Sequence, residues 1–424
     1  MQWSLAPSRD RRYWQRNFQP RVPVLCLYAL AARGSQPELC VPAGRKGLNP
    51  NARLHGVDGM LTLLRSLLAT LLLGGLLVSP ALTANEVSLP RKTGGAPDKD
   101  ESYPGVTVLY DAIRDTGGHR LRVIATHPLD RHHGAARYPV IFIVGWLSCD
   151  TVEAPPGTRD GTQRMLRAMA EVPGFATVRL EKQGVGDSEG DCATTDFTAE
   201  LAAYRQAFRH LRDYPFVDRD QIFLFGMSNG GGFAPLVAEG LPVKGYVVDG
   251  GWIKTWFEHM LEIERRRLAL SGHVPSEINS LMKSEEQLYS AYLLKHQSPH
   301  EVFAAQPQLK TLWEGADDQQ YGRPIVYYQQ LQDLDLMNAW SSVRVPVLAL
   351  HGEYDWIMSR SDFELLVDLV NHNVPGAAEF VELPHTGHTF EHYASQQSAF
   401  EGKQLPFDES VAQRVAGWLT AHRE

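Results

Sequence analysis

The sequence predicts an α/β fold, with a mostly parallel sheet covered by helices on both faces. Short apolar runs alternate with amphipathic helical segments from residue 106 onward, a pattern typical of parallel sheets. Runs such as residues 140–144 and 222–225 lack alternating polar positions, as expected of strands buried on both faces. The alternation breaks at about residues 252–342, where helical segments occur without a convincing strand. We interpret this stretch as a helical lid inserted over the top of the sheet.

The expected elements follow in chain order. Strands are expected at residues 106–113, 121–127, 138–144, 175–180, 222–225, 243–248, 345–350 and 377–383. Helices are expected at residues 162–171, 196–214, 233–239, 253–270, 276–294, 362–371 and 409–422. Most of the lid's aromatic residues are expected to pack in its core, while one or two line a substrate pocket; they are Trp252, Trp256, Phe257, Trp313, Tyr327 and Tyr328.

The segment from residue 60 to residue 84 has the anatomy of a secretory signal. Arg65 provides a short basic region, residues 67–78 are apolar, and small residues that suit cleavage follow. A buried or membrane-anchoring helix is the alternative. Since a signal should begin a protein, translation is expected to start at Met60, which makes residues 1–59 a non-native extension; a basic functional arm is the competing interpretation. Residues 85–104 are expected to be a loose linker, and residues 105–424 the folded domain.

Charge and cysteine content narrow the function further. The net charge is −8, although residues 1–59 are basic, so the folded part is acidic. This argues against nucleic acid as a partner, because phosphate binding needs clustered Lys and Arg. Only Cys149 and Cys192 would remain after removal of the signal. An even pair in an exported protein suggests a disulfide, with free buried thiols as the alternative.

The strongest chemical motif is Gly226-Met227-Ser228-Asn229-Gly230. It is an instance of G-x-S-x-G between an apolar run and a helical segment, a context in which the serine hydroxyl is raised above the sheet edge. A glycine-rich turn without catalytic function is the simpler interpretation. The motif gains weight from its downstream partners, because a serine nucleophile needs a base and the base needs an orienting carboxylate.

Both partners follow later strands, in the order that this motif requires. Asp355 lies just beyond the strand ending near residue 350 and is the expected acid, with Glu353 as the weaker candidate. His388, preceded by Gly387, is the expected base, with His385 as the fallback.

A developing oxyanion also needs two N–H donors. The backbone of Asn229 is expected to supply one, and the loop after residue 144 the other, from Trp146 first or Leu147 second.

Neither a metal nor a dinucleotide cofactor is expected. His385, His388 and His392 have a metal-like spacing, but no completed ligand set accompanies them. The loop at residues 184–190 contains G-x-G, but its third glycine is one place late for a dinucleotide fingerprint and no helix follows directly.

Together these motifs resemble the α/β-hydrolase superfamily. The resemblance rests on residues 226–230, Gly352-x-x-Asp355 and Gly387-His388, and it covers about residue 106 to the C-terminus. The loop at residues 181–188 is similar to the D-x-R-G-x-G-x-S stretch of the esterase and serine-aminopeptidase-like branch. Two departures stand out: Val144-Gly145 replaces the usual His-Gly, and Gln183 replaces the loop arginine. The resemblance implies an α/β-hydrolase fold, a Ser228, Asp355 and His388 triad, and neighbouring loops in which a Cys149–Cys192 disulfide clamps the oxyanion loop.

Three functions are compatible with these features. The first is an exported, secreted or periplasmic, serine esterase that cleaves small acyl esters without a cofactor and has no stable membrane anchor after signal cleavage. The second is a serine peptidase acting on short peptides, of a lid-bearing type because the chain has no room for a long extra domain. The third is a binding protein that kept the fold and lost catalysis. The oligomeric state, the acyl-chain length and the natural substrate are not encoded in these motifs.

Overall fold

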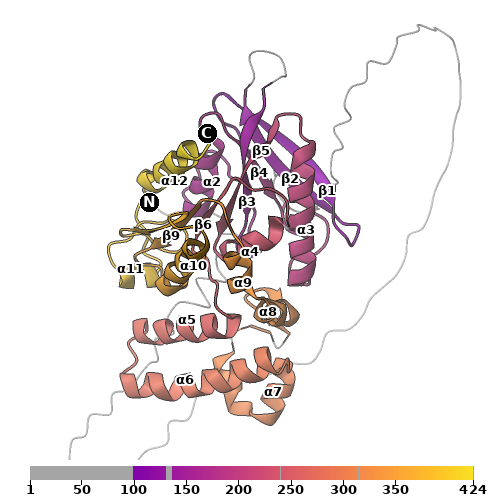
Figure 1. Cartoon of the computed structure of the whole chain (residues 1–424). Helices are drawn as coiled ribbons and strands as arrows, with labels where there is room; N and C mark the ends of the chain where they lie inside the picture. The colour runs from indigo at the N-terminus through magenta and orange to yellow at the C-terminus, as the bar shows by residue number, and fades with distance from the viewer. Residues whose placement is uncertain (1–98, 130–135, 239, 314, 317, 424) are drawn as a thin grey trace, which may run out of the picture. The chain divides into compact units, whose positions relative to one another are not determined.

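Eight strands form the central sheet of the computed structural model, which describes residues 99–129, 136–238, 240–313, 315–316 and 318–423. The strands are β1 (Val106–Arg114), β2 (Arg120–Pro128), β3 (Tyr138–Val144), β4 (Ala176–Leu180), β5 (Val217–Met227), β6 (Gly245–Asp249), β9 (Val347–Gly352) and β10 (Ala378–Leu383). Their spatial order is β1-β2-β4-β3-β5-β6-β9-β10 (Figure 1). β2 pairs antiparallel with β1 and β4, whereas the pairs from β4 to β10 are parallel. The expected mostly parallel sheet is therefore confirmed.

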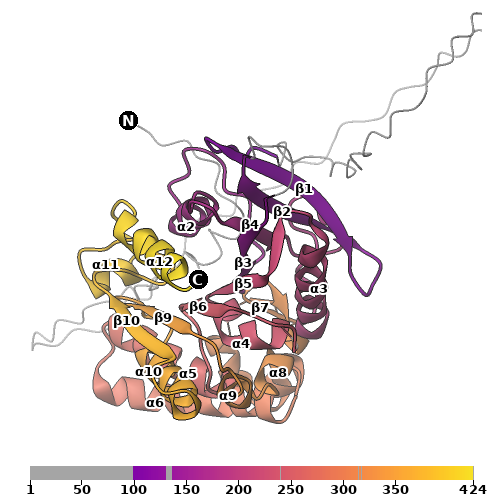
Figure 2. The ribbon, with the colours of Figure 1, turned by 45° about the horizontal axis from the view of Figure 1, so that its top comes forward.

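Helices cover both faces of the sheet. On one face lie α2 (Gly161–Ala170) and α12 (Glu409–Ala421), and on the other lie α3 (Phe197–His210), α4 (Asn229–Ala238) and α10 (Arg360–Asn373) (Figure 2). The apolar strand runs supply both cores. On β3, for example, Ile141 and Ile143 join the core under α2 and α12, while Phe142 packs in the core on the α3 side. This explains why β3 contains no polar alternation.

Side-chain caps fix where several helices begin. Asp160 accepts a hydrogen bond from the backbone of Gln163 at the start of α2, and Asp196 accepts one from Ala199 at the start of α3. Each cap satisfies a backbone N–H that the helix itself leaves without a partner.

The chain between β6 and β9, which we call the insertion, is rich in helix. It contains α5 (Trp256–Leu270), α6 (Pro275–Tyr289), a π turn (Ser290–Leu294), α7 (Pro299–Ala305), a 3-10 turn (Pro307–Leu312), α8 (Ile325–Gln332) and α9 (Leu336–Ser341). Two short strands, β7 (Gln319–Gln320) and β8 (Arg323–Pro324), pair with each other and were not expected from the sequence. Of the aromatic residues expected to pack, Trp252, Trp256, Trp313, Tyr327 and Tyr328 are buried, and Phe257 is half-buried. The insertion's long helices α5 and α6 lie beyond one end of the sheet (Figure 1).

The start of the folded part differs from the expected loose linker. Residues 85–98 of that segment, the extension at 1–59 and the signal at 60–84 lie outside the described residues. Glu101 and Tyr103, however, are buried, and Glu101 binds Arg179 on β4 with both carboxylate oxygens, at 2.8 and 2.6 Å. A buried ion pair thus ties this end of the segment to the sheet, which the polar composition of the segment did not reveal. Among the described residues, no helix is long and apolar enough to cross a bilayer.

Candidate active site

Ser228 occupies the sharp turn between β5 and α4. Its backbone has φ 55°, a left-handed conformation that non-glycine residues seldom adopt outside functional turns. The two motif glycines allow the close approach around it. A Cβ atom on Gly226 would lie 2.6 Å from the Cα of Gly231, and one on Gly230 would lie 2.3 Å from the carbonyl oxygens of Val144 and Gly145. The helix begins at Asn229, immediately after the serine, whereas the sequence suggested a start at residue 233.

His388 and Asp355 meet Ser228 at the carboxyl edge of the sheet. The Oγ atom of Ser228 lies 2.8 Å from Nε2 of His388, and Nδ1 of His388 lies 2.8 Å from Oδ2 of Asp355. Asp355 follows β9 and His388 follows β10, so the three side chains come from strands that are adjacent or nearly adjacent in the sheet. Ser228, Asp355 and His388 follow one another along the chain in the order expected when the serine lies on a strand-to-helix turn. The order of β5, β9 and β10 in the sheet places all three at the same edge.

The sheet topology, with β2 alone antiparallel, and the serine turn after β5 are those of the α/β-hydrolase fold. No protein-family model matches the sequence, and no curated protein matches it. Solved structures with a similar backbone include a hypothetical protein from Pseudomonas aeruginosa, with 15% identity, a TM-score of 0.47 and coverage of 79% of this chain and 99% of that one. An esterase from Pyrococcus furiosus has 12% identity, a TM-score of 0.46 and coverage of 79% and 97%. The esterase domain of a Rhodothermus marinus protein has 17% identity, a TM-score of 0.44 and coverage of 75% and 98%. These similarities concern the backbone alone.

The surroundings of Asp355 keep its carboxylate ionised. Burial would raise the pKa of Asp355, but the charge and hydrogen bond of His388, the charge of His351 and a backbone N–H lower this pKa to about 2. The second carboxylate oxygen accepts hydrogen bonds from the backbone N–H groups of Ile357 and Met358, at 2.8 and 2.9 Å. Asp355 therefore holds the Nδ1 side of His388 as an anion in a fixed orientation.

The acid-bearing loop is also fastened to the insertion. Arg266 on α5 donates hydrogen bonds to the carbonyl oxygens of Trp356 and Ile357, both at 2.7 Å. These peptides adjoin the N–H groups that hold Asp355, so the insertion supports the acid from outside the sheet.

The alternative candidates pair with each other. Glu353 accepts a hydrogen bond from the backbone N–H of His385 at 2.8 Å, and the ring of His385 contacts the hydroxyl of Tyr354 at 3.0 Å. Both side chains are largely exposed. In the described part of the chain, no group of three or more His, Cys, Asp or Glu side chains is arranged to hold a metal ion.

The expected oxyanion donors lie on two elements next to the serine. Asn229 is buried, and its side chain bonds to the hydroxyl of Tyr327 and to the indole of Trp252, at 3.1 and 2.8 Å. Both the nitrogen and the oxygen of its side-chain amide therefore have protein partners. Trp146 and Leu147 lie on the loop after β3, and Leu147 is the more buried of the two.

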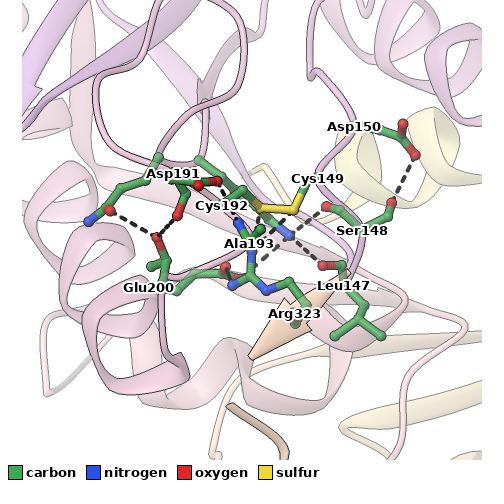
Figure 3. Close-up of a disulfide and its surroundings, with 12 residues drawn as sticks. Leu147, Ser148, Cys149, Asp150, Asp191, Cys192, Ala193, Glu200 and Arg323 are labelled. Atoms are coloured by element: carbon green, nitrogen blue, oxygen red, sulfur yellow. Dashed lines mark hydrogen bonds and ion pairs between the residues drawn. A yellow bond between two sulfur atoms is a disulfide. The ribbon is translucent and has the colours of Figure 1, made fainter. Parts of the chain in front are cut away.

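Cys149 and Cys192 form a disulfide, as expected. Their Cα atoms lie 6.0 Å apart. The bond joins the loop after β3, which carries Trp146 and Leu147, to the loop after β4 (Figure 3). Arg323 of the insertion points its guanidinium at Cys192 and Glu200 (Figure 3).

Two buried titratable groups near the site were missed by the sequence reasoning. Asp249 ends β6, and burial, reinforced by the nearby charge of Asp355, raises its pKa well above the usual value. His259 on α5 is buried against Trp252 and Trp256, and burial, with the charges of Arg266 and His388, lowers its pKa to about 3. His259 is therefore uncharged at neutral pH. Asp249 ends an apolar strand run and His259 sits within a helical stretch, so neither carried a recognisable motif.

Proposed function

We propose that the protein is an exported hydrolase of carboxylic esters that works through a covalent acyl-enzyme on Ser228. The observation that carries this proposal is the continuous path of hydrogen bonds from Ser228 through His388 to Asp355, each link 2.8 Å long. Such a path is what converts a weakly nucleophilic hydroxyl into a catalytic one.

The three side chains have distinct roles in the proposed catalytic triad. His388 removes the proton from Ser228 as the hydroxyl oxygen attacks the acyl carbonyl carbon, and Asp355 stabilises the imidazolium that forms. His388 then returns the proton to the departing alcohol oxygen, which leaves the acyl group on Ser228. Water, deprotonated by His388, attacks the acyl-enzyme and releases the acid, after which Ser228 regains its proton.

Negative charge on the tetrahedral oxygen needs donors that are already in place. We assign this role to the backbone N–H of Asn229, at the start of α4, together with the loop after β3, from Trp146 or Leu147. The N-terminal end of α4 adds a favourable dipole at the same point.

A labelling and hydrolysis experiment tests the proposal. The purified protein, from residue 85 onward, is treated with a fluorescent fluorophosphonate and assayed on p-nitrophenyl esters of increasing acyl length, with p-nitroanilides of short peptides in parallel. We expect labelling and ester hydrolysis in the wild type, and loss of both in Ser228→Ala. Ser410→Ala, an exposed serine on α12, is the matched control and should behave as wild type.

The same experiment decides between the three functions. Preferential cleavage of the anilides would favour the peptidase. A folded protein that neither labels nor hydrolyses any substrate would contradict catalysis and favour a binding role.

Export forms a separate part of the proposal and rests on the sequence of residues 60–84 together with the disulfide, since disulfides persist mainly in oxidising compartments. Expression from Met60 in a bacterial host, followed by fractionation and N-terminal sequencing, tests it. A mature N-terminus near residue 82 or 85 in the exported fraction is expected, and an uncleaved protein retained in the cytoplasm would contradict export.

A further inference from the structure

A buried cation lies directly behind the loop that carries the proposed oxyanion donors. Lys182 follows β4, is 6% exposed, and donates hydrogen bonds to three consecutive carbonyl oxygens of that loop. These belong to Trp146, to Leu147 at 3.2 Å and to Ser148 at 3.0 Å. An ammonium has three donors, and here all three are used on a single stretch of backbone.

This arrangement fixes which way the peptide groups face. In a trans peptide the carbonyl and the following N–H point in opposite directions. With the three carbonyl oxygens held at Lys182, the N–H groups of Leu147, Ser148 and Cys149 point away from the ammonium. Of the two candidate donors in this loop, Lys182 therefore orients the N–H of Leu147, because the N–H of Trp146 belongs to the preceding peptide. A flipped peptide would instead expose a carbonyl oxygen, whose partial negative charge would repel an oxyanion.

Lys182 is itself held by a buried carboxylate. Oε1 of Glu200 on α3 lies 3.5 Å from the ammonium, and both side chains are buried. Glu200 also accepts hydrogen bonds from Arg323 and from the hydroxyl of Tyr327, the latter at 3.1 Å.

The same carboxylate reaches the second proposed donor. The hydroxyl of Tyr327 accepts a hydrogen bond from the side chain of Asn229 at 3.1 Å. Glu200 thus interacts with both Lys182, which binds the loop after β3, and Tyr327, whose hydroxyl binds the side chain of Asn229. Figure 3 shows Glu200 and Arg323 beside the disulfide, with Leu147 and Ser148 on the facing loop.

We propose that Lys182, supported by Glu200, is a positioning residue that locks the oxyanion loop in its donor-forward orientation. This inference rests on the proposed function, because it concerns the same site. The disulfide restrains the end of the loop at Cys149, whereas Lys182 sets the orientation of the peptides before it. Lys182 does not touch the substrate and acts only through the backbone of Trp146, Leu147 and Ser148.

The charge state of Lys182 gives the proposal a pH signature. Burial lowers the pKa of Lys182 to about 8, a change that Glu200 opposes and the charge of Arg323 reinforces, with Asp150 on the loop also opposing it. Above this pKa the side chain is a neutral amine with only two N–H donors. One of its three carbonyl partners then loses its hydrogen bond, and the attraction of the positive charge is lost for all three. Catalysis should therefore decline as pH rises through about 8, and Glu200→Gln should move this decline to lower pH, because the neutral amide no longer favours the ammonium.

The experiment compares Lys182→Met and Glu200→Gln with wild type. Lys182→Met keeps a similar side-chain volume but removes the charge and the donors. We expect kcat for a short acyl ester to fall by about tenfold to a hundredfold, since small misplacements of catalytic groups cost this much, with KM little changed. Affinity for a trifluoromethyl ketone, which forms a tetrahedral adduct with an oxyanion, should fall in proportion to kcat/KM, and the alkaline decline in rate should disappear.

Arg212→Met is the matched control. Arg212 also donates to two backbone carbonyl oxygens, those of Phe208 and Pro242, at 2.8 and 2.9 Å. Arg212 precedes the amino end of β5 and Pro242 precedes the amino end of β6, whereas the proposed triad lies at the carboxyl ends of the strands. This variant should keep wild-type kcat and ketone affinity. Hydrogen exchange of the peptide spanning residues 145–152 should accelerate in Lys182→Met and stay unchanged in Arg212→Met.

The outcomes separate this inference from the proposed function. If Ser228→Ala abolishes hydrolysis while a folded Lys182→Met keeps wild-type kcat, ketone affinity and loop exchange, the inference is wrong and the esterase proposal stands. If wild type itself neither hydrolyses esters nor labels with fluorophosphonate, both fall together. Should Lys182→Met fail to fold, Glu200→Gln decides by its pH profile: an alkaline decline at the wild-type position would overturn the inference.

Discussion

Removing the carboxylate of Glu101 should destabilise the protein severely. Both of its oxygens bind the guanidinium of Arg179, at 2.8 and 2.6 Å, and both side chains are almost fully buried. Glu101 also accepts hydrogen bonds from the hydroxyl of Tyr103 at 2.7 Å and the backbone N–H of Ala154 at 2.6 Å. Glu101→Ala would leave Arg179 with the carbonyl of Val152 and with the charge of Glu153, to which it has no direct ion pair.

The size of the effect follows from the cost of an unpaired buried charge. Breaking a buried ion pair by removing one partner costs about 3 to 5 kcal/mol in the free energy of unfolding. The unfolding entropy of about 2.1 cal/mol/K per residue gives a Tm shift of about 1.5 °C per kcal/mol for a domain of about 320 residues. Glu101→Ala should therefore lower the Tm by about 4 to 7 °C. Circular dichroism melts and urea titrations measure it.

A double variant and an exposed pair serve as controls. Glu101→Leu combined with Arg179→Met removes both charges and should recover most of the lost stability, because buried pairs can often be replaced by apolar residues. Glu364→Ala breaks an exposed pair with Arg360 and should leave the Tm essentially unchanged. A Tm for Glu101→Ala equal to that of wild type would refute the reasoning and show that Arg179 is compensated in another way.

Three further predictions concern the site and its supports. Asp355→Asn should lower kcat by about ten-thousandfold with an unchanged fold, because the amide cannot hold the required tautomer of His388; steady-state kinetics and the Tm together measure this. Burial, assisted by Asp160, raises the pKa of Glu391 to about 7, so the folded state binds this proton more tightly than the unfolded chain. The stability from this group is therefore full below its unfolded pKa and is lost as pH rises through about 7; Glu391→Gln should flatten the dependence of the free energy of unfolding on pH in that window. Replacing Cys149 and Cys192 by Ala should cost up to about 4 kcal/mol, from the closure of the intervening loop, and a Tm equal to that of the oxidised wild type would contradict this.

The strands and the proximity of Ser228, Asp355 and His388 were predictable because their signals are local. Buried parallel strands appear as unbroken apolar runs, and each site residue stands at the end of such a run, where chain order alone brings Ser228, Asp355 and His388 to one edge. The disulfide was expected from the even pair of cysteines and from the neighbouring loops that the α/β-hydrolase resemblance implies. Element ends were less certain: α4 starts at Asn229 because a helix can tolerate Gly230 and Gly231 where close packing requires them.

The buried polar network could not be predicted from the sequence. Lys182, Glu200 and Arg323 are far apart along the chain, and each is a charged residue of the kind usually found on the surface. Arg323 joins Lys182 and Glu200 only because the insertion folds back onto α3 and the loop after β4, which no local pattern encodes. Gln183, which stands at the arginine position of the resembling motif, instead bonds to Asp115 and Thr195, outside the proposed triad.

Two arginines of the insertion bind the loops around the proposed triad, and this limits how the insertion can be altered. Arg266 binds the two carbonyl oxygens that follow Asp355 in the chain. Arg323 binds Glu200 on α3. A chimera in which another segment replaced the insertion would lose both Arg266 and Arg323. Glu200 would then lose its hydrogen-bonded ion pair with Arg323. Redesign of the insertion should therefore keep Arg266 and Arg323 and vary only the residues between them.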